Sequence, residues 1–224
     1  MLSVSRPLCV RSLVFCLAAS LAAFVATPAA HAQASSGTSA LDRQLGRVDF
    51  ALSGVGVLTR DVSGTNYLGQ SQDHNTSSTV GALIAFRYTK SPWKGGEFNI
   101  GYSRYTHNFS AVIVGGAQAS NLEFTLGYVA HPTHQILGAQ PFFGGGGGLL
   151  YFRPTSGGGQ GLPNQGAGAI YYTVGLEKAI SPHFGVRVLA RQLFYRSPDF
   201  YQNYLNVNKY TSTFEPGFGL YVHF

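Results

Sequence analysis

Eight segments of the chain alternate between apolar residues and small or charged residues, and this alternation limits the folds that the sequence can adopt. Between Val80 and Tyr88, for example, the even positions are apolar, whereas the odd positions carry small or apolar residues and, at the end, Arg87. A period of two residues is typical of a β-strand whose two faces meet different surroundings. The eight segments comprise residues 47–60, 78–89, 97–107, 119–131, 140–153, 167–178, 184–196 and 213–224.

The composition favours a barrel that crosses a membrane. Only 11% of the residues are charged, whereas soluble domains carry about 25%. No segment after residue 32 approaches the ~18 consecutive apolar residues of a spanning helix, and a closed barrel is the other structure that satisfies the backbone within a bilayer. The segments, roughly 10 to 14 residues each, are long enough for tilted membrane strands. We therefore predict an all-β fold, an eight-stranded antiparallel up-and-down transmembrane β-barrel at residues 47–224.

The connections between the segments alternate in length, as they do in membrane barrels with short periplasmic turns and long external loops. The long connections are rich in Gly, Ser, Asn and Gln, and we expect them to be external and mobile. The short ones contain Pro92, Pro132 and Pro182, which cannot donate to a strand ladder. The long connections are 61–77, 108–118, 154–166 and 197–212, and the short ones are 90–96, 132–139 and 179–183.

Alternation alone does not tell which face of a barrel is inside. Soluble barrels such as lipocalins place apolar residues inside, and membrane barrels place them outside. Glycines such as Gly81, Gly101 and Gly127 share the charged face, and an eight-stranded lumen has room only for small or few side chains. We therefore expect the apolar face to meet lipid. The run from Gly144 to Gly148 interrupts the pattern and predicts close strand packing or a bend.

The N-terminal residues resemble a secretory signal peptide. Arg6 and Arg11 precede an apolar stretch, and Ala30 and Ala32 form a small-residue cleavage site. We expect a signal peptide at 1–32, removed on secretion, and a polar leader at 33–46. Both cysteines lie in the signal peptide, so the mature chain is expected to have no disulfide, thiol nucleophile or cysteine metal site. The basic residues are scattered, so we expect no nucleic-acid partner.

Charged residues on the presumed inner face predict an internal ion-pair network, because unpaired charges in a narrow interior are costly. Arg87 and Glu97 flank Pro92 symmetrically, and Glu177 and Arg187 flank Pro182 in the same way, which predicts two cross-strand pairs. A structural plug is the interpretation that we favour, and a polar conduction path is the alternative. The predicted network comprises Arg87, Glu97, Glu123, Glu177, Arg187, Arg191 and Glu215.

Aromatic residues are expected at both bilayer interfaces, where amphipathic rings are favoured. Histidines offer weaker signals. His131 and His134 are three residues apart but have no cysteine or acidic partner nearby, so we expect no metal and no cofactor. His107 and Ser110 could form a nucleophile pair in a lipid-hydrolysing barrel, although no acidic residue can be assigned to orient the histidine. The expected interfacial rings are Tyr88, Trp93, Phe98 and Phe184 at the short-turn end, and Tyr151, Tyr171, Phe194, Tyr195 and Phe214 at the loop end.

With these features in view, the chain resembles the OmpA/OmpX-like family of eight-stranded outer-membrane β-barrels over residues 47–224. In that family a last strand that ends in an aromatic residue, with apolar residues at alternate positions before it, is similar to the signal read by the barrel-assembly machinery. The matching residues here are Phe218, Leu220, Val222 and Phe224. The sequence departs from the two-domain members because it ends at Phe224, so a role in tethering the cell wall is not expected.

The sequence predicts residence in the cell outer membrane and a non-enzymatic role. We expect a structural or surface-binding barrel with a plugged polar interior and four long external loops. Its expected partners are outer-membrane lipid, the barrel-assembly machinery during biogenesis, and an extracellular partner reached through the loops. A narrow porin-like channel and a membrane-embedded lipid-modifying enzyme are the alternatives.

Overall fold

The structure is a computed structural model that describes residues 40–110, 116–156, 158 and 161–224. The predicted signal peptide at 1–32 and leader residues 33–39 lie outside the described residues. The rest of the leader contains the six-residue helix α2 (Ala40–Leu45), which directly precedes the first strand. No helix in the described part of the chain is long and apolar enough to cross a membrane.

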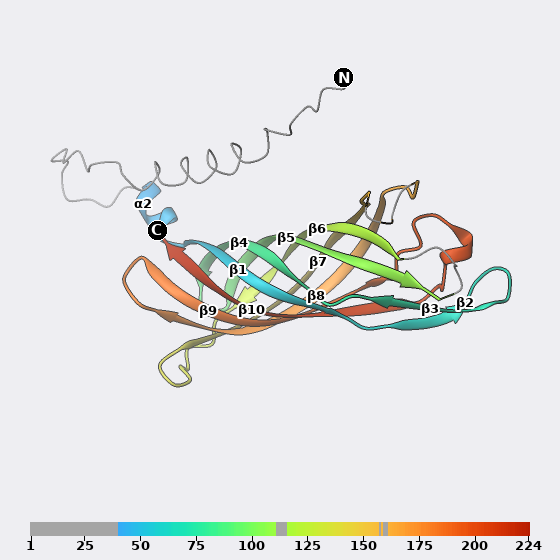
Figure 1. Ribbon diagram of the computed structural model, residues 1–224. Helices are drawn as coiled ribbons and strands as arrows, with labels where there is room; N and C mark the ends of the chain where they lie inside the picture. The colour runs from blue at the N-terminus through green and yellow to red at the C-terminus, as the bar shows by residue number, and fades with distance from the viewer. Residues whose placement is uncertain (1–39, 111–115, 157, 159–160) are drawn as a thin grey trace, which may run out of the picture. The chain divides into compact units, whose positions relative to one another are not determined.

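Eight antiparallel strands form the wall of a closed barrel (Figure 1). They are β1 (Val48–Thr59), β4 (Thr79–Ser91), β5 (Lys94–Phe109), β6 (Ala117–Ala130), β7 (Gln140–Pro154), β8 (Gln165–Ala179), β9 (Phe184–Arg196) and β10 (Tyr210–His223). Each barrel strand pairs with the barrel strands before and after it in the chain, and β10 closes the wall by pairing with β1. The predicted eight-stranded antiparallel up-and-down barrel is therefore confirmed.

The strand bounds agree closely with the alternating segments of the sequence. β9 has the predicted bounds at both ends, whereas β5 begins at Lys94 rather than at residue 97, and β10 begins at Tyr210 rather than at residue 213. These extensions have a simple reason. Backbone pairing continues past the last residue of a clear alternation, because the ladder does not depend on side-chain polarity.

The two faces of the wall differ as the alternation predicted. On the outside, Val80 is 80% exposed and Leu126 is 66% exposed, whereas on the inside Leu83 is 4% exposed. The apolar face thus points outward, and the interior holds the charged, small and some apolar side chains. Two of the aromatic rings expected at the loop-end interface are an exception. Tyr171 and Tyr195 are buried and point into the barrel, because their positions share the inward parity of their strands.

At Gly144, Gly146 and Gly148, the glycine run of β7 lies against β6 without room for a side chain. A β-carbon added at Gly146 would collide with the carbonyl oxygen of Leu126, and one at Gly148 would collide with that of Phe124. The close strand packing predicted for this run is therefore observed.

Two of the long connections are folded rather than irregular. Residues 61–77 contain a hairpin of β2 (Val62–Thr65) and β3 (Ser71–Thr76), and β3 pairs with the end of β5, which extends the barrel wall at the loop end. Residues 197–212 contain the short 3-10 helix η1 (Asn203–Leu205). Gln72 and Phe200 in these connections are fully buried. The expectation of mobile loops thus does not describe these two segments, since their side chains pack over the mouth of the barrel.

Candidate functional site

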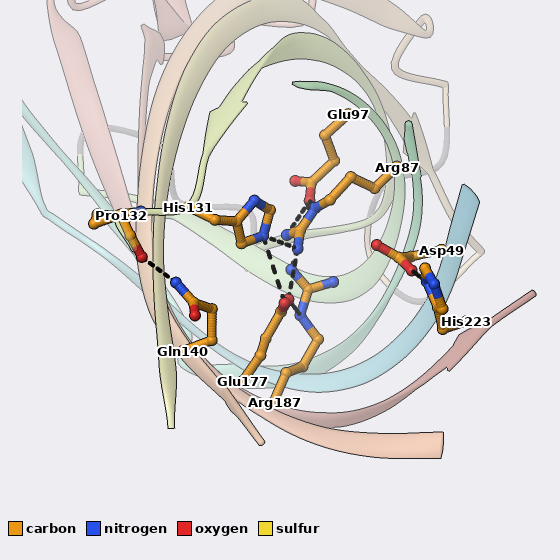
Figure 2. A network of polar contacts seen from close by, with 9 residues as sticks. All are labelled: Asp49, Arg87, Glu97, His131, Pro132, Gln140, Glu177, Arg187 and His223. Atoms are coloured by element: carbon orange, nitrogen blue, oxygen red, sulfur yellow. Dashed lines mark hydrogen bonds and ion pairs between the residues drawn. The ribbon is translucent and has the colours of Figure 1, made fainter. Parts of the chain in front are cut away.

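The interior of the barrel near the short turns contains a cluster of charged side chains from four strands and one turn. The members of this short-turn cluster are Arg87 of β4, Glu97 of β5, His131 after β6, Glu177 of β8 and Arg187 of β9. Figure 2 shows their side chains converging in the middle of the barrel. Both arginines and Glu97 are at most 4% exposed, so these charges are removed from water.

The two predicted cross-strand pairs lie opposite each other in the strand register. Arg87 is the register partner of Glu97, and Glu177 is the register partner of Arg187. The Nη2 atom of Arg87 lies 2.6 Å from Oε2 of Glu97, and Nε of Arg187 lies 3.5 Å from Oε1 of Glu177. The structure therefore brings together the residues of both hairpins.

The pairs are also joined across the lumen, which the sequence did not predict. The Nη1 atom of Arg87 donates to Oε1 of Glu177 on the facing wall at 2.6 Å, and Nη2 of Arg187 donates to Oε2 of Glu97 at 3.5 Å. The network thus connects β4 and β5 with β8 and β9. Each charge therefore has partners on both sides of the barrel.

Within the short-turn cluster Arg87 also contacts His131, and the ring of Phe142 packs beside both arginines. Nη1 of Arg87 lies 2.9 Å from Nε2 of His131, and this Nε2 atom lies 3.5 Å from Oε2 of Glu177. The guanidinium carbon atoms of Arg87 and Arg187 lie 4.6 and 4.9 Å from the centre of the Phe142 ring. Such cation–π contacts add to the stability of a desolvated cation.

A second group of charges, the central cluster, lies between the short-turn cluster and the loop end. Its members are Glu123, Thr125, Tyr171, Arg191 and Glu215. Arg191 of β9 forms an ion pair with its register partner Glu215 of β10 at 3.0 Å, and it reaches across the lumen to Glu123 of β6. Its Nη2 atom also donates to Thr125 Oγ1 at 2.8 Å. The guanidinium lies 4.4 Å from the centre of the Tyr171 ring.

The two clusters differ in formal charge. The short-turn cluster has two arginines and two glutamates, whereas the central cluster has one arginine, Arg191, and two glutamates, Glu123 and Glu215.

A cavity of about 10 Å³ lies beside Glu123, Glu215 and Asn121, which is roughly the space that one water molecule needs. The side-chain oxygen of Asn121 has no hydrogen-bond partner within the described structure. One water molecule there would give it a partner.

At the loop end of the barrel lies a buried group of aromatic and imidazole rings with one serine, which we call the loop-end cap: His74, His107, Phe109, Ser197 and Phe200. Nε2 of His74 and Nδ1 of His107 share a hydrogen bond of 2.9 Å, and Nδ1 of His74 contacts the hydroxyl of Ser197. The His74 ring stacks on Phe109 with ring centres 4.5 Å apart, and Phe200 packs edge-on against His107. Burial lowers the pKa of His74 from 6.5 to about 4, so this imidazole is neutral at neutral pH.

The short-turn end, in contrast, is open to solvent. A cavity of about 450 Å³ is lined by Asp49, His131, Glu177, Tyr221 and His223, among others. At its wall, Nδ1 of His223 lies 2.5 Å from Oδ1 of Asp49, which links β10 to β1 (Figure 2). Glu177 and His131 line this cavity and are also members of the short-turn cluster, so the cluster forms one wall of the cavity.

The weaker chemical candidates of the sequence are not assembled into sites. Nδ1 of His107 bonds to His74, and the hydroxyl of Ser110 accepts a hydrogen bond from the backbone of Asp73. His107 and Ser110, the candidate nucleophile pair, therefore form hydrogen bonds with different residues. His131 points inward to Glu177 and Arg87, whereas His134 is exposed.

The sequence reasoning missed His131 and the histidines of the cap as members of polar networks. His131 lies just beyond the end of β6, where the alternation no longer assigns a face. His74 lies in a segment that was read as an irregular loop. The alternation Gln72, His74 and Thr76 opposite Asp73 and Asn75 was the available signal for a strand, but it is short and entirely polar.

Comparisons with known proteins identify the fold. No protein-family model and no curated protein matches the chain. Neisserial surface protein A is 15% identical, with 78% of this chain and 97% of that chain covered and a TM-score of 0.50. The outer membrane protein OprG from Pseudomonas aeruginosa is 18% identical, with 79% and 96% covered and a TM-score of 0.52. The chain therefore has the fold of the eight-stranded outer-membrane β-barrels, as the resemblance predicted.

Proposed function

We propose that this protein resides in the outer membrane as a non-enzymatic, non-conducting barrel that presents its loop end to partners outside the cell. The observation that carries the proposal is the filled interior. The short-turn cluster, the central cluster and the loop-end cap follow one another along the barrel axis, and each joins facing walls or closes the mouth. A barrel filled in this way acts through its outer surface and loops.

Membrane residence is supported by the outward apolar face. Leu126, Leu149 and Ile170 are each more than 60% exposed on the outside of neighbouring strands, whereas a monomeric soluble protein rarely exposes a continuous apolar surface of this kind. Electrophoretic mobility of the membrane-extracted protein before and after boiling tests this part. We expect a heat-dependent shift, and a freely soluble protein without a shift would contradict membrane residence.

Conductance in planar bilayers tests the closed interior. We expect a silent bilayer with the wild-type protein, because charge pairs and rings occupy successive levels of the lumen. The matched variants are Glu177→Gln and Arg187→Gln, each of which removes one charge from the lumen. Ion conduction by the wild type, altered in these variants, would contradict the proposal and support a narrow pore.

Exposed tyrosines support a surface-binding role for the loop end. Tyr67, Tyr201 and Tyr210 are each more than 65% exposed, and they lie in or next to the folded connections. Tyrosine is enriched among residues that contribute most to protein interfaces. Cells that display the wild type or the Tyr67→Ser/Tyr201→Ser variant can be compared for adhesion to an extracellular-matrix surface. We expect weaker adhesion of the variant, and equal adhesion would argue against these loops as the binding surface.

A further inference from the structure

A row of polar side chains crosses the outer face of β5, β6 and β7 near the loop end. In the strand register, Arg104 lies opposite Ser120, and Ser120 lies opposite Arg153. We call these three residues the arginine row. Both arginines are exposed, whereas the neighbours Tyr105 and Phe152 on the same strands are buried in the barrel. The two arginines therefore share the outward face and lie on either side of one small residue.

The arginine row lies directly above an apolar row on the same three strands. The outward residues one step closer to the short turns are Tyr102, Leu122 and Tyr151, which are again register partners. The two tyrosines are 49% and 40% exposed. Two strand residues span about 7 Å, so the surface changes from aromatic and apolar to cationic over one step. This is the level at which a bilayer changes from acyl chains to head groups.

Arg104 is held in place by neutral acceptors. Its Nη2 atom donates to Oε1 of Gln118 at 2.6 Å and to Oγ1 of Thr155 at 3.3 Å. Thr155 follows the end of β7, so the guanidinium leans across β6 toward the strand that carries Arg153. Within the described part of the chain, neither arginine forms an ion pair. Arginine has five donors, so the remaining ones of Arg104 are available to an anion.

We propose that the arginine row binds the phosphate group of a phosphorylated lipid in the external leaflet. Neighbouring strands lie about 4.8 Å apart, so the backbones of Arg104 and Arg153 are about 10 Å apart, and two long side chains can converge on one group between them. Guanidinium groups bind phosphate oxygens through paired, charge-assisted hydrogen bonds. The rings of Tyr102 and Tyr151 lie where the apolar part of such a lipid would continue. The inference rests on the membrane residence proposed above.

A second cationic depression at the loop end is less suited to this ligand. It has a volume of about 380 Å³ and is lined by Arg60, Lys209 and Tyr210, but the carboxylate of Asp61 lines it as well. A carboxylate opposes an anion. The arginine row has no such group among its register partners or hydrogen-bond partners.

Native mass spectrometry of the detergent-folded barrel tests the proposal. Dioleoyl phosphatidic acid and dioleoyl phosphatidylcholine serve as probes, because they differ in the phosphate monoester but share their acyl chains. We expect the wild type to prefer phosphatidic acid, and we expect the Arg104→Gln/Arg153→Gln variant to bind it roughly tenfold or more weakly, since two charge-assisted contacts are lost. The control, Lys94→Gln/Lys178→Gln, removes two exposed cations at the short-turn end and should retain the preference.

Three results would overturn the proposal: an unchanged preference in the arginine variant, an equal loss in the lysine variant, or full displacement of the lipid by an equal concentration of inorganic phosphate. The last result would show a site for phosphate rather than for a lipid. Each protein is first checked for a mobility shift on boiling. Failure of the lipid site in a barrel that shifts leaves membrane residence intact, whereas a soluble protein without a shift would contradict the proposed function itself.

Discussion

The short-turn cluster and the central cluster use the same residue types in different ratios. In the short-turn cluster, Arg87 and Arg187 alternate with two glutamates, so the formal charges cancel. In the central cluster, Arg191 lies between Glu123 and Glu215, so the formal charges sum to one negative charge. The comparison shows that a barrel interior can hold one balanced layer and one unbalanced layer. The loss of a carboxylate should therefore destabilise the balanced layer more than the unbalanced layer.

Replacing Arg191 with methionine should have the largest effect, because it leaves both carboxylates of the central cluster without a cation. Removal of one partner from a buried pair costs about 3 to 5 kcal/mol. Urea unfolding in detergent micelles, followed by the fluorescence of the single tryptophan, Trp93, measures the loss. The outward Arg153→Met variant is the control and should change stability little. Equal losses in both variants would show that the ion pairs of Arg191 contribute nothing.

Two glutamine substitutions sharpen the comparison. Glu97→Gln should destabilise the barrel by about 2 to 3 kcal/mol, because two buried arginines then share one carboxylate. Glu215→Gln should change stability by less than about 1 kcal/mol, because the remaining Arg191 and Glu123 form a balanced pair. The same unfolding assay measures both. A larger loss for Glu215→Gln than for Glu97→Gln would contradict the charge count on which the comparison depends.

The loop-end cap provides a third region, which is held together by neutral rings. Because burial lowers the pKa of His74 from 6.5 to about 4, the opened cap binds a proton that the closed cap does not bind. Its stability is full above pH 6.5 and falls as the pH drops toward 4, by about 2 kcal/mol at pH 5. Hydrogen exchange of residues 61–77 at pH 7 and pH 5 measures this. His74→Gln should reduce the difference, and an unchanged pH dependence would exclude His74 as a contributor.

The smallest effect is expected at the partly exposed pair of Asp49 and His223. Their side chains are 18% and 44% exposed, and such pairs contribute at most about 1 kcal/mol. Asp49→Asn should therefore shift the urea midpoint only slightly compared with Glu97→Gln. A shift as large as that of Glu97→Gln would mean that closure between β1 and β10 depends on this pair.

The sequence predicted the barrel because a barrel strand is defined by a local pattern, whereas the exact strand ends and the hairpin of β2 and β3 lay outside that pattern. It predicted the pairs Arg87–Glu97 and Glu177–Arg187 because each pair belongs to one hairpin, in which the turn sets the register. It did not predict the contact of Arg191 with Glu123, because these residues lie on facing walls and are distant in the chain. Which inward residues meet across a lumen depends on barrel closure, and no local pattern encodes it.

The backbone pairing of β1 with β10 has a gap, and its cause is local. Pro216 lies in β10 and has no N–H group to donate, and the register of β1 with β10 is interrupted between Val55, which pairs with Gly217, and Leu58, which pairs with Phe214. The alternation passes through Pro216 unchanged, so a reading based on side-chain polarity does not detect the gap.

The hairpin of β2 and β3 has a consequence for recognition. Because β3 is paired with β5 and its residues Gln72 and His74 are buried, this part of the loop-end surface has a defined shape without a partner. Binding to an ordered surface avoids the loss of conformational entropy that a flexible loop would suffer. A partner of this hairpin would therefore meet one shape, and its selectivity would depend on matching that shape.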